Sequence, residues 1–444
     1  MLLNKILLRT QNFCAELYQK SSVLRFVDNF ILISILALIT TLNFASSDHI
    51  GYFAIFTILL TFIKLLIKPN EKFILSLADK FLLIYFMIVL ISVAGSSLLT
   101  LSIKGFSKTI IYIGFYISLV HYLKDNLKNL KLILLALTLS VFVESLIAIN
   151  QNFISVSEIS GWQDMTRLNP EDVMTRVYGS IKPFNPNLFG GYILTILPST
   201  LATIFIPLKN RHYKTALCAF LCLLMGIATI FMTGCRGAYL GLFIELILFG
   251  LLTYKFLKPK FKKLFLTLSG FISSIIFMFI ISITSLRSRI FSIFAMRNDS
   301  SNSFRFNVYN SCIEMFKDNW LLGIGVGNQN FREIYGLYMK TGFDALSAYN
   351  IYLEIAVESG IFALLAFISF ILVNLKNAFL YINKKNNIKS LYLAIAASSI
   401  IGIFVHGIVD TVFFRPQIQF VFWIMVAIIR VMTYSRGVYG RARN

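Results

Sequence analysis

The chain has 444 residues, of which 57% are hydrophobic and 14% charged, and its formal net charge is +21 at pH 7. Soluble globular chains are markedly less apolar, so the mean hydropathy of +0.76 excludes a soluble enzyme and leaves no polar stretch for a separate soluble domain. The positive charge does not indicate nucleic-acid binding, because the basic residues lie in short segments between apolar runs and form no basic and aromatic module.

Apolar runs long enough to cross a bilayer recur from end to end. The sequence therefore predicts an all-α, polytopic helix bundle whose transmembrane domain covers residues 28–433. Residues 1–27 are basic and show no small-residue cleavage site before the first full-length span, so they are expected to be a cytoplasmic lead rather than a signal peptide. Residues 434–444 are expected to be a basic cytoplasmic tail. The twelve predicted spans lie near 28–46, 50–67, 81–101, 106–123, 130–154, 186–206, 214–233, 237–254, 263–283, 348–372, 391–411 and 417–433.

The positions of the 41 lysines and arginines predict the orientation of the bundle. If the N-terminus is inside, every even-numbered connection between spans is basic, as the positive-inside rule requires of cytoplasmic segments. Both termini are then cytoplasmic, in a multi-pass protein of the bacterial inner membrane. Two outer connections are long, near residues 155–185 and 284–347.

The turn between spans seven and eight reads Thr-Gly-Cys-Arg-Gly-Ala, residues 233–238. It places Arg236 at the outer N-terminus of a helix, where backbone N–H groups and the helix dipole favour an anion. A guanidinium group adds bidentate contact to phosphate. An interfacial arginine that extends to lipid headgroups is the alternative interpretation.

The outer connection 284–347 is rich in arginine, which runs against the usual charge bias and suggests an anionic ligand. Its stretch Gly-Ile-Gly-Val-Gly-Asn, residues 323–328, resembles a phosphate-binding loop but lacks the strand and helix of a Rossmann unit, so a tight turn is the alternative. A helical pattern is expected through Cys312 and Met315. The basic residues of the connection are Arg287, Arg289, Arg297, Arg305, Lys317, Arg332 and Lys340.

Span ten opens with three polar residues spaced by four, Asn350, Glu354 and Glu358, which line one helical stripe. A carboxylate well inside a span is a functional candidate by default, and a structural pair with a neighbouring span is the alternative. Structural roles are expected for the other two intramembrane acids, Glu144 and Glu245.

The end of span eleven carries His406 and Asp410, one helical turn apart, followed by Arg415 in the outer turn. Asp410 could fix the tautomer of His406 for proton transfer, and a charge-paired helix cap explains the pattern equally well. The cysteines show no CxxC or zinc spacing, so no metal site is expected. A disulfide between Cys235 and Cys312, both on the predicted outer side, remains an open alternative.

Together these segments resemble the O-antigen ligase and polymerase superfamily of inner-membrane proteins. Three elements carry the likeness: CRGA at 235–238, the outer connection with Arg305 and NWLLGIGVGN at 319–328, and SAYNIYLE at 347–354. The likeness covers about residues 175–433. TRVYGSIKPFNPNLFGGY at 175–192, LSAYNIYLEIAVESG at 346–360 and HGIVDTVFFRPQIQFVFW at 406–423 are similar to a cyanobacterial branch that carries the name of an inorganic-carbon transporter.

The resemblance implies a metal-independent and cofactor-independent glycosyl transfer at the periplasmic face. The donor would be a glycan on undecaprenyl diphosphate, and the acceptor a hydroxyl of lipid A–core or another glycan. Arg236 and Arg305 stand at the two arginine positions that hold the diphosphate. The other residues that we expect at the diphosphate are Arg287, Arg415 and Asn350.

The resemblance also places Tyr349 where the ligases keep a histidine that acts on the acceptor. Since a phenol is a poor base at neutral pH, the proton acceptor is expected to be Glu354, or His406 with Asp410, and Glu354 is favoured. The rival functions are a transporter of a small anion such as bicarbonate, a polymerase of the same superfamily and a non-catalytic membrane scaffold. Membrane lipids are expected partners, and nucleic acid is not.

The predicted orientation can be tested with reporter fusions. Fusions at residues 165, 235 and 330 should report the outer side, and fusions at 70, 260 and 385 the cytoplasm, because basic connections stay inside. An inside signal at residue 330 would contradict the outer placement of the candidate site.

Overall fold

The computed structural model describes residues 26–67, 75–153, 176–385 and 387–434, together with Phe13 and Glu16. Most of the predicted cytoplasmic lead, residues 154–175 of the first long outer connection and nearly all of the basic tail lie outside the described residues. Within the described ranges, every regular element is a helix, and 12 helices are long and apolar enough to cross a membrane. The prediction of an all-α bundle of about twelve spans is therefore confirmed.

Each predicted span corresponds to one helix or one broken helix. The sixth span consists of α8 and α9, joined by the 3-10 turn η3 that contains Pro198. The spans are α3 (Val27–Phe44), α4 (Ser47–Ile67), α5 (Leu77–Ala94), α6 (Leu99–Asp125), α7 (Leu130–Phe153), α8 (Pro186–Ile196) with α9 (Thr200–Lys209), α10 (Tyr213–Met232), α11 (Arg236–Phe256), α12 (Pro259–Ser282), α16 (Ile351–Lys384), α17 (Ile388–His406) and α18 (Pro416–Tyr434).

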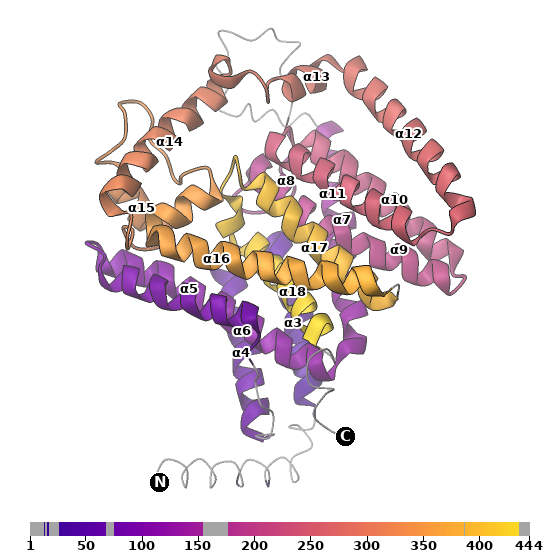
Figure 1. Cartoon of the computed structure of the whole chain (residues 1–444), viewed down its shortest axis with the longest axis horizontal. Coiled ribbons are helices and arrows are strands. Elements are labelled where there is room, and N and C mark those ends of the chain that lie inside the picture. The colour runs from indigo at the N-terminus through magenta and orange to yellow at the C-terminus, as the bar shows by residue number, and fades with distance from the viewer. Residues whose placement is uncertain are drawn as a thin grey trace.

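The outer connection between α12 and α16 is itself helical, with α13 (Thr284–Phe291), η4 (Met296–Asn298), α14 (Ser300–Asn319) and α15 (Asn328–Tyr335). In Figure 1, α13 and α14 lie over one end of the bundle, and α12 lies to one side of α10 and α11. α14 contains the predicted helical stretch through Cys312 and Met315. This arrangement brings the outer connection over the start of α11.

α17 packs closely against α8 and α11 through small residues. A Cβ atom on Gly237 of α11 would lie 2.2 Å from His406 Cδ2, and one on Gly241 would lie 2.7 Å from the Gly402 carbonyl oxygen. From the α8 side, a Cβ atom on Gly191 would meet the same His406 ring at 2.9 Å. Small residues allow helix backbones to approach in a membrane, so these three helices form a tight seam below the outer face.

α17 ends at His406, five residues earlier than the predicted span. Gly407 caps the helix, and the chain turns before the short 3-10 helix η5 (Val412–Phe414). Asp410 therefore lies in this turn and not on the helix one turn beyond His406, so the helical i, i+4 spacing expected from the sequence is wrong.

α16 is broken at Gly360, which has φ +80° and ψ 174°. The glycine-rich stretch of the outer connection enters the break: Ile324 N–H donates to the Val357 carbonyl at 3.0 Å, and Gly325 N–H donates to the Glu358 carbonyl at 2.9 Å. On the far side of the break, Ile361 N–H donates to the Trp320 carbonyl at 2.9 Å. These hydrogen bonds at the break join the outer connection to α16.

Gly360 should not tolerate a side chain. A Cβ atom there would lie 2.1 Å from the Leu321 carbonyl oxygen, and the positive φ is unfavourable for other residues. We expect Gly360→Ala to lower the free energy of unfolding by about 2 kcal/mol or more, measured by thermal denaturation in detergent. Gly250→Ala in α11, where a Cβ atom meets nothing within 4 Å, is the control and should cause no loss.

Candidate functional site

The start of α11 forms the centre of the site. Gly234, with φ +61°, turns the chain, and the helix begins at Arg236. The Arg236 side chain is buried, and its Nη1 donates to Ser292 Oγ at 2.9 Å and pairs with Asp299 Oδ1 at 3.0 Å. Its Nη2 is buried and has no hydrogen-bond partner among the described residues. One arm of the guanidinium fork is thus occupied and the other is available.

Two further arginines hold the same turn. Arg289 Nε donates to the Gly234 carbonyl at 2.9 Å, and Arg176 Nε donates to the Thr233 carbonyl at 2.7 Å. Burial and the nearby charge of Arg176 together lower the pKa of Arg289 to about 10. The sequence reasoning did not single out either residue, although Arg289 belongs to the basic outer connection and Arg176 to a stretch that carries the resemblance.

The segment that carries Arg176 is fixed to the outer end of α7. The Glu144 carboxylate accepts from Ser180 Oγ at 2.5 Å and from Ser180 N–H at 3.0 Å. Gln151 Oε1 accepts from the N–H groups of Tyr178 and Gly179, at 3.1 and 2.9 Å. Glu144 therefore has the structural role expected of it, and it sets the position of an arginine of the site.

Arg305 approaches the same place from α14. Its Nη1 donates to Ser301 Oγ at 2.9 Å, its Nη2 lies 3.7 Å from Asp410 Oδ2, and its buried Nε has no partner in the described part of the chain. Asp410 Oδ2 also accepts from Asn187 Nδ2 at 3.0 Å, and Asn187 Oδ1 accepts from Arg176 Nη2 at 2.5 Å. These contacts link α8, α14 and the turn after α17.

The four arginines make the site electrostatically positive. Burial lowers the pKa of Arg176, and the charges of Arg305 and Arg236 lower it further. Among the described residues, the ion pairs of these arginines involve two carboxylates, those of Asp299 and Asp410. Buried like charges repel strongly in a low dielectric, so an anion between them is stabilising. The structure thus brings together Arg236 and Arg305, which lie far apart in the sequence.

Tyr349 lies beside this cluster. Its ring centroid is 5.7 Å from the Arg305 guanidinium carbon, and its carbonyl accepts from the Tyr309 hydroxyl at 3.0 Å. Burial and the charge of Asp410 together raise the pKa of Tyr349 to about 12. The phenol therefore stays protonated at neutral pH and can donate a hydrogen bond but not accept a proton.

Asn350 and Glu354 have backbone partners. The Asn350 side chain accepts from Leu353 N–H at 2.9 Å and donates to the Ile408 carbonyl at 2.8 Å. Glu354 is buried, and its Oε2 accepts from Ala348 N–H at 2.7 Å. Both side chains thus hold the start of α16 in place, and neither has a described contact with the arginine cluster.

His406 is fully buried in the seam of small residues. Its Nε2 lies 3.5 Å from Cys235 Sγ, and its Nδ1 has no partner among the described groups, so Asp410 does not fix its tautomer. Burial raises the pKa of the Cys235 thiol, but the His406 ring and the charge of Arg176 together lower it, and the net direction is downward. Cys235 and Cys312 are both free thiols, which removes the disulfide alternative.

Two predicted diphosphate contacts lie elsewhere. Arg287, on α13, donates through Nη1 to the Ile281 carbonyl at 3.2 Å. Arg415 precedes α18 and interacts electrostatically with Glu354. Arg289, two residues beyond Arg287, is the residue of α13 that reaches the turn at Gly234.

The glycine-rich stretch is a structural turn. The N–H groups of Gly323, Ile324 and Gly325 donate to backbone carbonyls, and Gly327 N–H donates to Glu358 Oε1 at 2.9 Å. A phosphate loop needs free N–H groups that point at the ligand, and these four are occupied. The Glu358 carboxylate binds this turn and not a neighbouring span.

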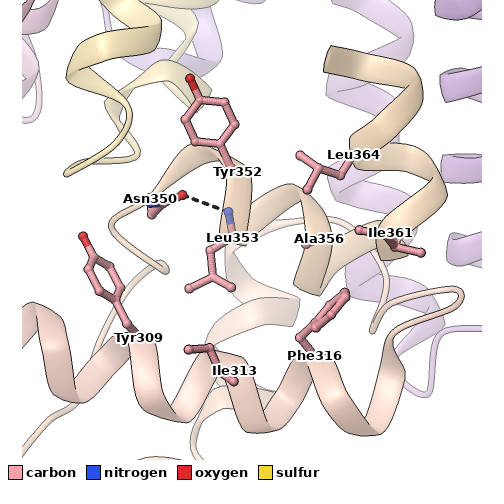
Figure 2. A pocket seen from close by; sticks show the side chains of 9 residues that line it. All are labelled: Tyr309, Ile313, Phe316, Asn350, Tyr352, Leu353, Ala356, Ile361 and Leu364. Carbon is pink, nitrogen blue, oxygen red and sulfur yellow. Dashed lines mark hydrogen bonds between the residues drawn. The ribbon is translucent and has the colours of Figure 1, made fainter. Parts of the chain in front are cut away.

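An apolar cavity of about 400 Å³ lies between α14 and α16. Figure 2 shows Tyr309, Ile313 and Phe316 on α14 opposite Leu353 and Ala356 on α16. Its polar edge includes Tyr309, whose hydroxyl contacts the Tyr349 backbone. The cavity therefore begins next to the arginine cluster and continues along apolar side chains.

Residues 220–368 match the family model described as O-antigen ligase. The matched segment contains Arg236, Arg289, Arg305 and Tyr349, whereas Arg176, Asn187 and Asp410 lie outside it. No curated protein matches the chain. The match supports the O-antigen ligase superfamily and gives no support to the cyanobacterial branch.

Arg289 and Arg287 provide a matched pair of variants. We expect Arg289→Gln to weaken the binding of inorganic pyrophosphate by about tenfold, because a charge-assisted contact at the cluster is lost. Arg287→Gln removes the same charge from the same short helix, but this guanidinium contacts the Ile281 carbonyl and not the turn at Gly234, so the substitution should change affinity by less than about twofold. Titration calorimetry of the purified chain measures both, and equal losses would contradict the placement of Arg289.

Proposed function

We propose that the chain transfers a glycan from a polyprenyl-diphosphate carrier to an acceptor hydroxyl at the outer face of the bacterial inner membrane. The observation that carries this proposal is the convergence of four arginines at the start of α11, three of them inside the segment that matches the O-antigen ligase model. The basic connections between the spans support this orientation, because they then face the cytoplasm.

The unpartnered donors suit the diphosphate. Arg236 Nη2 and Arg305 Nε are buried and lack acceptors among the described residues, and guanidinium groups pair well with phosphate oxygens. As the acceptor oxygen bonds to the anomeric carbon, the bond from that carbon to the diphosphate oxygen breaks. The arginines stabilise the charge that develops on the leaving group.

The proton acceptor that the geometry favours is Asp410. Its carboxylate lies 3.7 Å from Arg305 Nη2 and contacts Asn187. Glu354, the residue favoured on sequence, is buried against the backbone of Ala348, and His406 is enclosed by glycines. Asp410 would take the proton of the acceptor hydroxyl, and the neutral phenol of Tyr349 would orient a sugar or phosphate oxygen.

The cavity between α14 and α16 supports a lipid-linked donor. Its lining is apolar below Tyr309 and Asn350, so it can accept part of a hydrocarbon chain whose diphosphate binds beside Arg305. The acceptor is lipid A–core for a ligase or a growing glycan for a polymerase, and both use the same donor chemistry. The helices pack closely around His406, below the cluster, and this packing opposes the passage of a small anion. It therefore favours transfer at the outer face over transport.

The direct test is reconstitution. The purified chain in liposomes is supplied with a polyprenyl-diphosphate-linked glycan and with either lipid A–core or a second lipid-linked glycan. Product on lipid A–core indicates a ligase, and a longer lipid-linked glycan indicates a polymerase. Uptake of labelled bicarbonate without transfer to either acceptor would refute the proposal in favour of the transporter.

Asp410→Asn should lower the turnover number at least about 100-fold, since a general base contributes on the order of 10²- to 10⁴-fold. Tyr349→Phe keeps the ring beside Arg305 and should cost only a few-fold. The measurement is the rate of glycan transfer at saturating donor. Near-normal turnover in Asp410→Asn would exclude Asp410 as the proton acceptor.

A further inference from the structure

Asp299 makes two contacts with one oxygen. Its Oδ1 pairs with Arg236 Nη1 at 3.0 Å and accepts from Asn302 N–H at 2.9 Å, which makes Asp299 the N-cap of α14. The pair is shielded from solvent, with side-chain exposures of 8% for Arg236 and 18% for Asp299. The carboxylate therefore has a capping role that needs no charge and a pairing role that does.

The pairing places an internal anion where the ligand is proposed to bind. Arg236 is the arginine at the start of α11, and its Nη1 already contacts Asp299 and Ser292. Any external anion that uses both arms of this guanidinium group has to displace the Asp299 carboxylate. A carboxylate and a phosphate oxygen compete for the same donor geometry.

We propose that Asp299 acts as an internal competitor that lowers the affinity of the site for every external anion, so that only an anion that also contacts Arg305 binds tightly. The inference rests on the proposed function, because it takes the diphosphate of the carrier as the ligand. It assigns to Asp299 a role that the matched arginines do not explain.

The physical reason is a difference in charge and reach. A monoanion such as bicarbonate offers Arg236 one negative charge, as Asp299 already does, and gains nothing from the exchange. A diphosphate carries more charge and can contact Arg236 and Arg305 together. Its attraction to the arginines is therefore stronger than the attraction between Asp299 and Arg236. Discrimination by an unfavourable exchange is a general route to specificity.

One substitution separates the two roles of Asp299. Asn is as good an N-cap as Asp, so Asp299→Asn keeps the cap of α14 and removes only the charge. Asp299→Ser repeats the test with a shorter capping side chain. Asp344→Asn is the matched control, because Asp344 pairs with Arg332 at 3.1 Å in the same outer connection but is exposed.

The experiment is titration calorimetry of the purified full chain with inorganic pyrophosphate, inorganic phosphate and bicarbonate, with thermal melting of each variant. We expect the wild type to prefer pyrophosphate. Asp299→Asn should bind pyrophosphate, phosphate and bicarbonate each about tenfold more tightly, because none of them then has to displace a carboxylate. Asp344→Asn should leave the three affinities unchanged.

The outcomes distinguish this inference from the proposed function. If the wild type binds pyrophosphate but the affinities are the same in folded Asp299→Asn and Asp299→Ser, Asp299 is a cap and not a competitor, and the diphosphate site stands. If the wild type does not bind pyrophosphate, both the inference and the proposed diphosphate site are overturned. An equal gain in affinity in Asp344→Asn would show a general charge effect and also overturn the inference.

Discussion

Repulsion among four guanidinium groups is the constraint on which this end of the helix bundle depends. Buried arginines of like charge separate unless acceptors hold them. The acceptors here are mostly neutral: the carbonyls of Thr233 and Gly234 and the hydroxyls of Ser292 and Ser301. Neutral acceptors fix the arginines without cancelling their charge, so the attraction for an anion remains.

The other polar groups around the cluster form hydrogen bonds with one another, and these bonds hold the surrounding segments in place. The N–H groups of the glycine-rich turn donate to α16 and Glu358, and Asn350 and Glu354 fasten the start of α16. Close contacts at Gly191 and Gly237 hold the α17 end against α8 and α11. Among the arginines of the site, Arg236 Nη2 and Arg305 Nε are the buried donors without a partner in the described part of the chain, so they remain available to an anion.

Much of the fold could be predicted from the sequence, because apolar run length and basic connections are strong signals. The candidate site was harder to predict from the sequence. Arg236 was found because it starts a helix after Gly234. Arg289 could not be separated from Arg287, since side-chain direction on a short helix depends on packing. Glu354 and Glu358 fit the spacing of a helical stripe, yet both accept hydrogen bonds from backbone N–H groups, those of Ala348 and Gly327. The spacing of the stripe cannot predict how these segments approach α16.

The turn that enters the break at Gly360 has a consequence for biosynthesis. Ser92 in α5 donates to the Glu358 carbonyl at 2.8 Å, and Ser96 donates to the Ile324 carbonyl at 2.8 Å. The polar groups of α5 and its C-terminal turn thus gain these partners only after more than two hundred further residues have been made. Asp410 is made later still, so the contacts that join α8, α14 and the turn after α17 are incomplete in a nascent chain until its last spans are present.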